Sequence, residues 1–384
     1  MLTLVTLAQL VSALASQGIG VWGGMAQQRY SFGVGQLGVL AGIANATTIL
    51  GMFLLAPRLD RHGERAWLFL GMLLLGTAFL LLGQATEYAG LVLAMAMAGL
   101  GYSPIQPAGS KAVYHWFGPQ QRGPAMGIRQ AALPLGGALA AVLFGWLLTR
   151  YSWAVTMSLI GGGLGLTACA FRFCYQEKRD LASQAQARSG WRGLQEYLDN
   201  TAFRDAAAVG IVLVAAQTML SVFWVAFIVG RSGGTVSEAA TYLMILQLAG
   251  AFGRIALPVL GQRLSISHRD TVVACGLLTA IILVALSFLP LSPSLLAGAS
   301  CLVGIVGFGW YGAWVVWLTE IAKPNEIGLV AGGAMTLNQV SIALTPVVIG
   351  FVVDWSGDFV PAFALLVVSI ASVLLWTRRE STGR

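Results

Sequence analysis

Long apolar runs fill most of this 384-residue chain. Each run is about the length that a helix needs to cross the hydrocarbon core of a bilayer. With 57% hydrophobic and 10% charged residues, the chain has too few polar side chains to cover a water-soluble globule. The runs lack the alternating pattern of barrel strands, so helices must satisfy the backbone polar groups. We therefore predict an all-α membrane protein with twelve transmembrane helices, near residues 2–24, 37–57, 65–84, 88–113, 123–148, 153–173, 205–229, 237–259, 271–290, 295–319, 327–352 and 359–377.

The basic residues predict the orientation of these helices. If the turn after the second span is cytoplasmic, sixteen of the 22 Lys and Arg residues lie on the cytoplasmic side. Only Arg29, Arg150 and Arg231 then lie outside, and three others fall within or at the edge of spans. The excess of cytoplasmic Lys and Arg predicts that both termini face the cytoplasm of a multi-pass protein of the inner membrane. This topology also explains the net charge of +7, so we expect no nucleic-acid partner.

The chain matches itself as two tandem halves. A shift of 202 residues places Trp22 on Trp224 and Arg29 on Arg231, and a shift of 208 places Gly99 on Gly307. An even number of spans in each repeat leaves both copies in the same orientation, related by an axis along the membrane normal. We therefore predict an N-terminal six-helix bundle over residues 1–173, a linker over 174–204 and a C-terminal six-helix bundle over 205–384. The linker is basic, and its apolar residues predict a short helix lying on the inner leaflet.

A cluster of charge, RLDRHGER, follows the second span and partly recurs as GQRLSISHRD in the second half. The first copy resembles the loop between helices 2 and 3 of the major facilitator superfamily, with the pattern filled by Asp60, Arg61, Gly63 and Arg65. Alanine stands where that family usually has a glycine four residues before the aspartate. The segments WFGPQQRGPAMGIRQ and TPVVIGFVVDWSGD also resemble family sequences, and the resemblance runs through the whole chain. It implies the major facilitator fold, two pseudo-symmetric six-helix bundles that move a solute by alternating access.

The resemblance also implies that the charged loop is a gate. Asp60 and the neighbouring Arg61 and Arg65 would hold the cytoplasmic helix ends together and release them on opening, with Gly63 in the turn. In the second copy only Arg263 is retained. The alternative is a solvated turn that only sets the topology.

Arg254 is the most deeply placed ionisable residue of the predicted spans. It precedes Arg263 by nine residues, which corresponds to roughly 13 Å of helix and reaches about mid-bilayer. The acidic residues of the seventh, eighth and ninth predicted spans, Asp205 and Glu238, lie at the ends of those spans, so none lies at its depth to neutralise it. Since an arginine keeps its proton and its fork matches a carboxylate, Arg254 is the predicted anchor of an anionic substrate. The resemblance implies the same, because an arginine of the eighth helix binds the substrate carboxylate in monocarboxylate and oxalate/formate facilitators. The alternative is that Arg254 caps carbonyl groups or only packs.

Other residues complete the predicted site. The tenth span carries tryptophans at helical spacing, and the resemblance implies that helices 1, 4, 7 and 10 line the cavity. An aromatic wall with a few amides suits an amphipathic organic anion, although packing against neighbouring helices explains the stripe equally well. The predicted wall comprises Trp310, Trp314, Tyr311, Trp22, Tyr102, Gln106, Gln17, Gln217 and Trp224. Lys111, Arg129 and Glu320 lie closer to cytoplasmic helix ends and are candidates for an anion exit or for coupling.

The predicted function is secondary transport of a small organic anion, with a co-transported proton or a counter-anion as the coupling partner. A proton-coupled drug or metabolite exporter of the same fold is the first alternative, although no carboxylate lies in the middle of any predicted span to bind a cation. A receptor that binds without transporting is the second. No GxSxG, HExxH or P-loop motif occurs, so we expect no enzyme activity, cofactor or metal site. We expect a monomer in the lipid bilayer.

Overall fold

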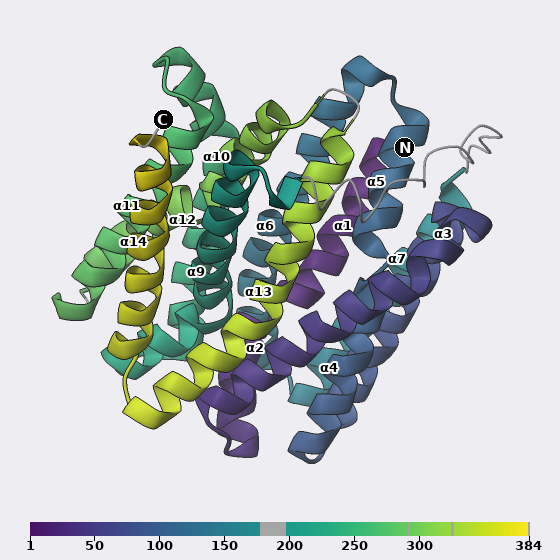
Figure 1. Ribbon diagram of the computed structural model, residues 1–384. Helices are drawn as coiled ribbons and strands as arrows, with labels where there is room; N and C mark the ends of the chain where they lie inside the picture. Colours follow the sequence, from purple (N-terminus) through teal and green to yellow (C-terminus); the bar gives the residue numbers. More distant parts are fainter. Residues whose placement is uncertain (177–196, 291, 324–325, 383–384) are drawn as a thin grey trace. The chain divides into compact units, whose positions relative to one another are not determined.

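The computed structural model describes residues 1–176, 197–290, 292–323 and 326–382. Within these ranges the side chains of residues 55–62, 119–120, 123–124, 327–328 and 378–382 are outside the description. The helices are α1 (Leu2–Gln17), α2 (Ile19–Tyr30), α3 (Val34–Gln84), α4 (Tyr88–Tyr102), α5 (Ile105–Trp116), α6 (Pro119–Arg150), α7 (Trp153–Cys174), α9 (Thr201–Ser232), α10 (Val236–Arg263), α11 (His268–Phe288), α12 (Pro293–Ile321), α13 (Ile327–Ser356) and α14 (Val360–Thr382) (Figure 1).

Twelve helical segments in the described part of the chain are long and apolar enough to cross a membrane. Two spans consist of paired helices: α1 with α2 forms Leu2–Tyr30, and α4 with α5 forms Tyr88–Trp116. Conversely, α3 contains two spans, Val34–Leu54 and Gly63–Gln84. The other eight span-forming helices of the described residues each provide one. The predicted all-α fold with twelve transmembrane helices is confirmed.

Gly63 breaks α3 between its two spans. Its backbone has φ 76° and ψ 165°, whereas the residues on both sides are helical. A positive φ of this kind costs a glycine little, because it has no Cβ to clash with the backbone. In the second half, Ser265 has φ 54° between α10 and α11. In both halves, the turn predicted after the second span therefore contains a residue with a positive φ.

The described residues belong to two compact units. The first contains the residues up to 176 together with Ser221–Met244, and the second contains residues 197–220 and those from Ile245 onward. In the first unit α3 lies beside α4 and α7, and α1 lies along α6. In the second, α11 lies between α12 and α14. The linker predicted for 174–204 falls mostly on residues outside the description, so the predicted domain boundaries stay a prediction.

Small residues let helices of the first unit approach closely. A Cβ added to Gly99 of α4 would lie 2.0 Å from the carbonyl oxygen of Ala44 in α3, and one added to Gly101 would lie 2.5 Å from the amide nitrogen of Leu75. Both distances are far below van der Waals contact, so neither position accepts a larger side chain without moving the helices. Close approach through small residues is the usual packing of membrane helices, since lipid is as apolar as leucine.

Candidate functional site

Arg254 lies on α10 in the second unit and points toward α12. Its Nε donates a hydrogen bond to the carbonyl oxygen of Phe308 (3.3 Å), and its Cζ lies 5.0 Å from the centroid of the Tyr311 ring. Its Nη1 is buried and has no hydrogen-bond partner. Among the described residues no carboxylate oxygen lies within 4.0 Å of this guanidinium. A cation over an aromatic face, with one donor left open, is an arrangement that can accept an anion.

Glycines hold α10 and α12 close enough for these contacts. A Cβ on Gly253 would lie 2.5 Å from the carbonyl oxygen of Ile305, and a Cβ on Gly309 would lie 2.8 Å from the carbonyl carbon of Gly253. On Gly312, one turn further along α12, it would lie 2.2 Å from the carbonyl oxygen of Arg254 itself. The position of the Arg254 guanidinium therefore depends on the absence of side chains at this seam.

Gly312→Ala should separate α10 from α12 at Arg254 and lower the free energy of unfolding by about 1–3 kcal/mol, the usual cost of overpacking. Gly298→Ala is the matched control, because Gly298 is also on α12 but has no atom within 4 Å of an added Cβ. Thermal unfolding of both purified variants in detergent measures the difference. Equal melting temperatures for the two variants would contradict the close packing.

A second buried guanidinium lies in the first unit. Arg129 of α6 is 0% exposed. Its Nη1 donates to Gln9 Oε1 (2.7 Å), and its Nη2 donates to Gln106 Oε1 (3.0 Å) and to Ser110 Oγ (2.8 Å). Gln9 Nε2 in turn donates to the hydroxyl of Tyr102 (3.2 Å). We call these five residues of α1, α4, α5 and α6 the Arg129 cluster.

The Arg129 cluster is polar but has no counter-ion. All three acceptors of the guanidinium are neutral oxygens, and its Nε is buried without a partner. Within the described part of the chain, no acidic side chain pairs with Arg129. A buried charge is expensive unless an opposite charge balances it, so both units contain a cation whose charge is uncompensated.

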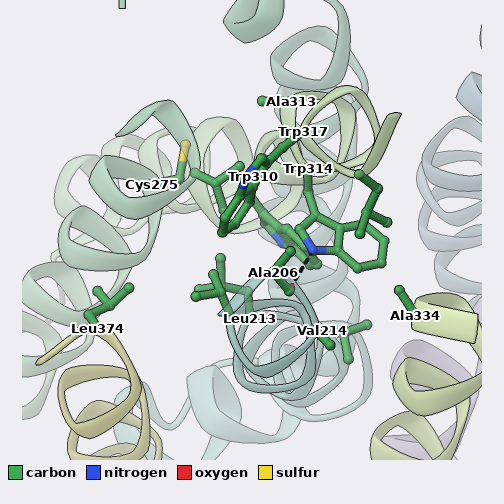
Figure 2. Packing of buried hydrophobic residues seen from close by; sticks show 14 of the residues in the cluster. Ala206, Leu213, Val214, Cys275, Trp310, Ala313, Trp314, Trp317, Ala334 and Leu374 are labelled. Atoms are coloured by element: carbon green, nitrogen blue, oxygen red, sulfur yellow. Dashed lines mark hydrogen bonds between the residues drawn. The ribbon is translucent and has the colours of Figure 1, made fainter. Parts of the chain in front are cut away.

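The two tryptophans of α12 in the predicted wall lie in the core of the second unit. Trp310 and Trp314 are 0% exposed and pack with residues of α9, α11, α13 and α14. Figure 2 shows them beside Ala206 and Leu213, with Trp314 Nε1 donating to the carbonyl oxygen of Ala206 (2.8 Å). Their rings lie 5.5 and 5.4 Å from that of Tyr311. This burial agrees with the packing alternative, and a contact of these two residues with the substrate stays a prediction.

The other predicted wall residues are distributed over both units. Trp22 and Trp224 are 0% exposed and pack against Trp153 and Phe227, respectively. Trp22 Nε1 and Gln217 Oε1 are buried without hydrogen-bond partners, and Gln17 is half-buried. Tyr102 and Gln106 belong to the Arg129 cluster. The sequence analysis thus named three members of that cluster but missed Gln9 and Ser110.

Two sequence signals indicate the missed members. Tyr102, Gln106 and Ser110 recur every four residues, which places them on one face of a helix. Gln9 is a polar residue in the middle of the first span, where an amide needs a partner.

The predicted gate is described only in part. The side chains of Asp60 and Arg61 lie outside the description, while Gly63 forms the turn and Arg65 donates from Nε to the carbonyl oxygen of Arg172 at the end of α7 (2.8 Å). Arg263 is exposed at the end of α10. The gating role stays a prediction.

Of the coupling candidates, Lys111 is half-buried on α5. Glu320 Oε1 lies 2.6 Å from His268 Nδ1, and the Glu320 side chain is 51% exposed. No three His, Cys, Asp or Glu side chains among the described residues lie close enough to hold a metal ion.

Comparison with known proteins shows relatives along nearly the whole chain. This chain is 23% identical over 378 residues to the "Hexuronate transporter" of Bacillus subtilis, and the match covers 94% of this chain and 89% of that protein. It is 25% identical over 281 residues to the "3-(3-hydroxy-phenyl)propionate transporter" of Escherichia coli, covering 72% of this chain and 68% of the relative. A bacterial homologue of the human lysosomal transporter Spinster, solved in an inward-facing and occupied conformation, superposes with a TM-score of 0.78 at 17% identity, covering 98% of this chain and 93% of that one.

The family assignment agrees with the fold and with these relatives. The family model "Major Facilitator Superfamily" matches residues 5–346, which is most of the chain. The relatives and the fold are those of transporters and not of enzymes. With its twelve apolar helices and internal repeat, this multi-pass membrane protein belongs to the Major Facilitator Superfamily.

Proposed function

We propose that this transporter carries a small organic acid in its ionised form, by alternating access, with Arg254 as the anchor of the carboxylate. The observation that carries the proposal is the state of the Arg254 guanidinium, which is stacked on Tyr311 and has a buried Nη1 without an acceptor. A carboxylate is the ligand that supplies both the missing acceptor and the missing negative charge.

The chemistry of the described residues favours an anion over a cation as substrate. A lipophilic cation needs a buried carboxylate as its counter-charge. The buried acidic side chains of the described residues are Glu64 and Asp205, which lie near helix ends and already contact His115 and Arg269. Among the described residues, the guanidiniums of Arg129 and Arg254 have no acidic partner, and both are positive, so the electrostatic preference is for a negative solute.

The relatives support the same class of substrate. Their names specify a hexuronate and a hydroxyphenyl propionate, both of which carry a carboxylate. The "Probable galactarate/D-glucarate transporter GudP" of Bacillus subtilis is a further relative, at 21% identity over 354 residues. The substrates named for these three relatives share a carboxylate. The rest of the molecule is polyhydroxylated in the sugar acids and aromatic in the phenylpropionate. We therefore propose the carboxylate as the recognised group.

The same distribution of charged residues bears on how substrate transport is coupled to an ion gradient. A transporter without a carboxylate in the middle of its spans has no obvious carrier for a proton on the protein itself. We propose that the charge moved is that of the substrate, balanced by a proton that enters with it or by exchange against a second anion. The half-exposed Glu320 is the protein group that we propose for a proton path.

Uptake into proteoliposomes tests the proposal. Purified protein should accumulate radiolabelled glucuronate or 3-phenylpropionate when a pH gradient is imposed, and an unlabelled acid should compete. Protein-free liposomes and a labelled lipophilic cation are the controls. Robust transport of the cation with none of either acid would favour the exporter alternative. Saturable binding without accumulation would favour the receptor alternative.

A further inference from the structure

A buried carboxylate joins three helix ends of the first unit. Glu64, the residue after the Gly63 turn in α3, is 1% exposed. Its Oε1 lies 3.0 Å from Nδ1 of His115 in the last turn of α5 and accepts a hydrogen bond from the hydroxyl of Tyr175, which follows α7 (2.9 Å). Trp116 Nε1 donates to the same tyrosine hydroxyl (3.2 Å).

The second unit has a corresponding pair. Nδ1 of His268, at the start of α11, lies 2.6 Å from Oε1 of Glu320 in the last turn of α12. Here the histidine occupies the position of Glu64, and the glutamate occupies the position of His115. The shifts that relate the two pairs are 204 and 205 residues, which lie within the range that relates the two halves of the chain.

A pair of arginines strengthens the correspondence. Arg65 follows Glu64 and donates to the carbonyl oxygen of Arg172 near the end of α7. Arg269 follows His268 and donates from Nη2 to the carbonyl oxygen of Thr377 in α14 (2.9 Å). These residues are again related by shifts of 204 and 205. Each unit thus has the same two bonds at the same positions, an acid–imidazole pair and an arginine–carbonyl bond.

We propose that both units carry one clasp in which the acid and the base are exchanged, Glu64–His115 in the first and His268–Glu320 in the second. The clasp, with its arginine, fastens the ends of the third, fourth and sixth spans of a unit to one another, so that these ends move as one body during transport. What the clasp requires is an acid opposite an imidazole. It does not require either group on a particular helix, since the chain itself contains both arrangements.

The surroundings of the two pairs predict unequal strength. Among the residues whose side chains are described, the charged groups near Glu64 and His115 on the packed elements are Arg65 on α3 and Arg172 on α7, and Lys111 lies one turn before His115. Within the same described part of the chain, those near His268 and Glu320 are Arg269 and Asp270 on α11, Asp205 on α9, and Lys323 after α12. Glu64 is 1% exposed, whereas Glu320 is 51% exposed. Water competes with the exposed pair and weakens it, so the clasp of the first unit is the stronger.

Exchange of the partners tests the clasp directly. Glu64→His alone leaves two imidazoles facing each other, and His115→Glu alone brings two carboxylates to about 3 Å, which cannot both stay ionised. Each single variant should lower the melting temperature and reduce the initial uptake rate roughly tenfold, while the double exchange E64H/H115E should recover most of both losses, as expected for residues that act as a pair. The matched exchange H268E/E320H should follow the same pattern in melting temperature, with smaller losses.

The melting temperature does not depend on the identity of the substrate, so the clasp and the proposed function can fail separately. A double exchange that is no more stable than the worse single variant, or that does not fold, would overturn the proposal. So would single variants that match the wild-type protein in both measurements. Recovery of the melting temperature without recovery of uptake would show that the pair is only a structural bond and would overturn its role in transport.

Discussion

Arg254→Ala is expected to abolish saturable uptake of an organic acid while leaving the protein folded. Removing one partner of a buried, hydrogen-bonded charge pair costs about 2–5 kcal/mol, which corresponds to a loss of affinity of roughly 30-fold or more. The fold should persist, because the replaced guanidinium makes one long hydrogen bond, to Phe308 O at 3.3 Å, and otherwise rests on Tyr311. Initial uptake rates at increasing concentrations of radiolabelled acid measure the effect.

Arg254→Lys should restore little of this uptake. An ammonium group keeps the charge but cannot form the two parallel hydrogen bonds of a guanidinium with a carboxylate. Arg150→Ala is the matched control, since Arg150 lies over the Trp146 ring at the same 5.0 Å but is exposed at the end of α6. It should transport like the wild-type protein. Undiminished uptake in Arg254→Ala would contradict the proposed site.

Arg129→Met should have the second large effect, a loss of stability. The substitution keeps an unbranched side chain but leaves the oxygens of Gln9, Gln106 and Ser110 without the donor that they share. A buried acceptor left unpaired costs about 1–3 kcal/mol; turning of the two amides and removal of the unbalanced charge each offset part of this cost, so we expect a net loss of about 2–5 kcal/mol. Chemical unfolding of the purified protein, followed by tryptophan fluorescence, measures this loss.

Ile128→Met provides the control for Arg129→Met. Ile128 is the preceding residue of α6 and is 54% exposed, so the same new side chain replaces a surface residue on the same helix. Its stability should be within about 0.5 kcal/mol of the wild-type protein. If Arg129→Met unfolds at the same denaturant concentration as Ile128→Met, the Arg129 cluster does not stabilise the first unit. A stable Arg129→Met protein without uptake would instead indicate that Arg129 binds the substrate.

Whether a segment crosses the membrane depends on its own residues, and this part of the fold could be predicted from the sequence. The twelve spans are confirmed, and a residue with a positive φ lies at the expected turn of each half, Gly63 and Ser265. Whether a segment of about twenty residues is stable in the hydrocarbon core depends on that segment alone, because every backbone group must be hydrogen-bonded within its own helix. Arg254 is a candidate on the same grounds, since an arginine in an apolar run is exceptional whatever its neighbours; its role as the anchor stays a prediction.

Which neighbour a helix face contacts depends on residues far away in the chain, so only the tertiary structure shows these contacts. The spacing of Trp310 and Trp314 indicated one face of the tenth span, but only the packing of Ala206 and Leu213 shows that this face lies in the core. Gln9 and Arg129 are 120 residues apart and lie on different helices, so no local pattern connects them. In lipid, apolar residues are favourable on every face of a helix, and hydrophobicity therefore determines that a helix spans the membrane but leaves its rotation and partners to close packing and polar contacts between helices.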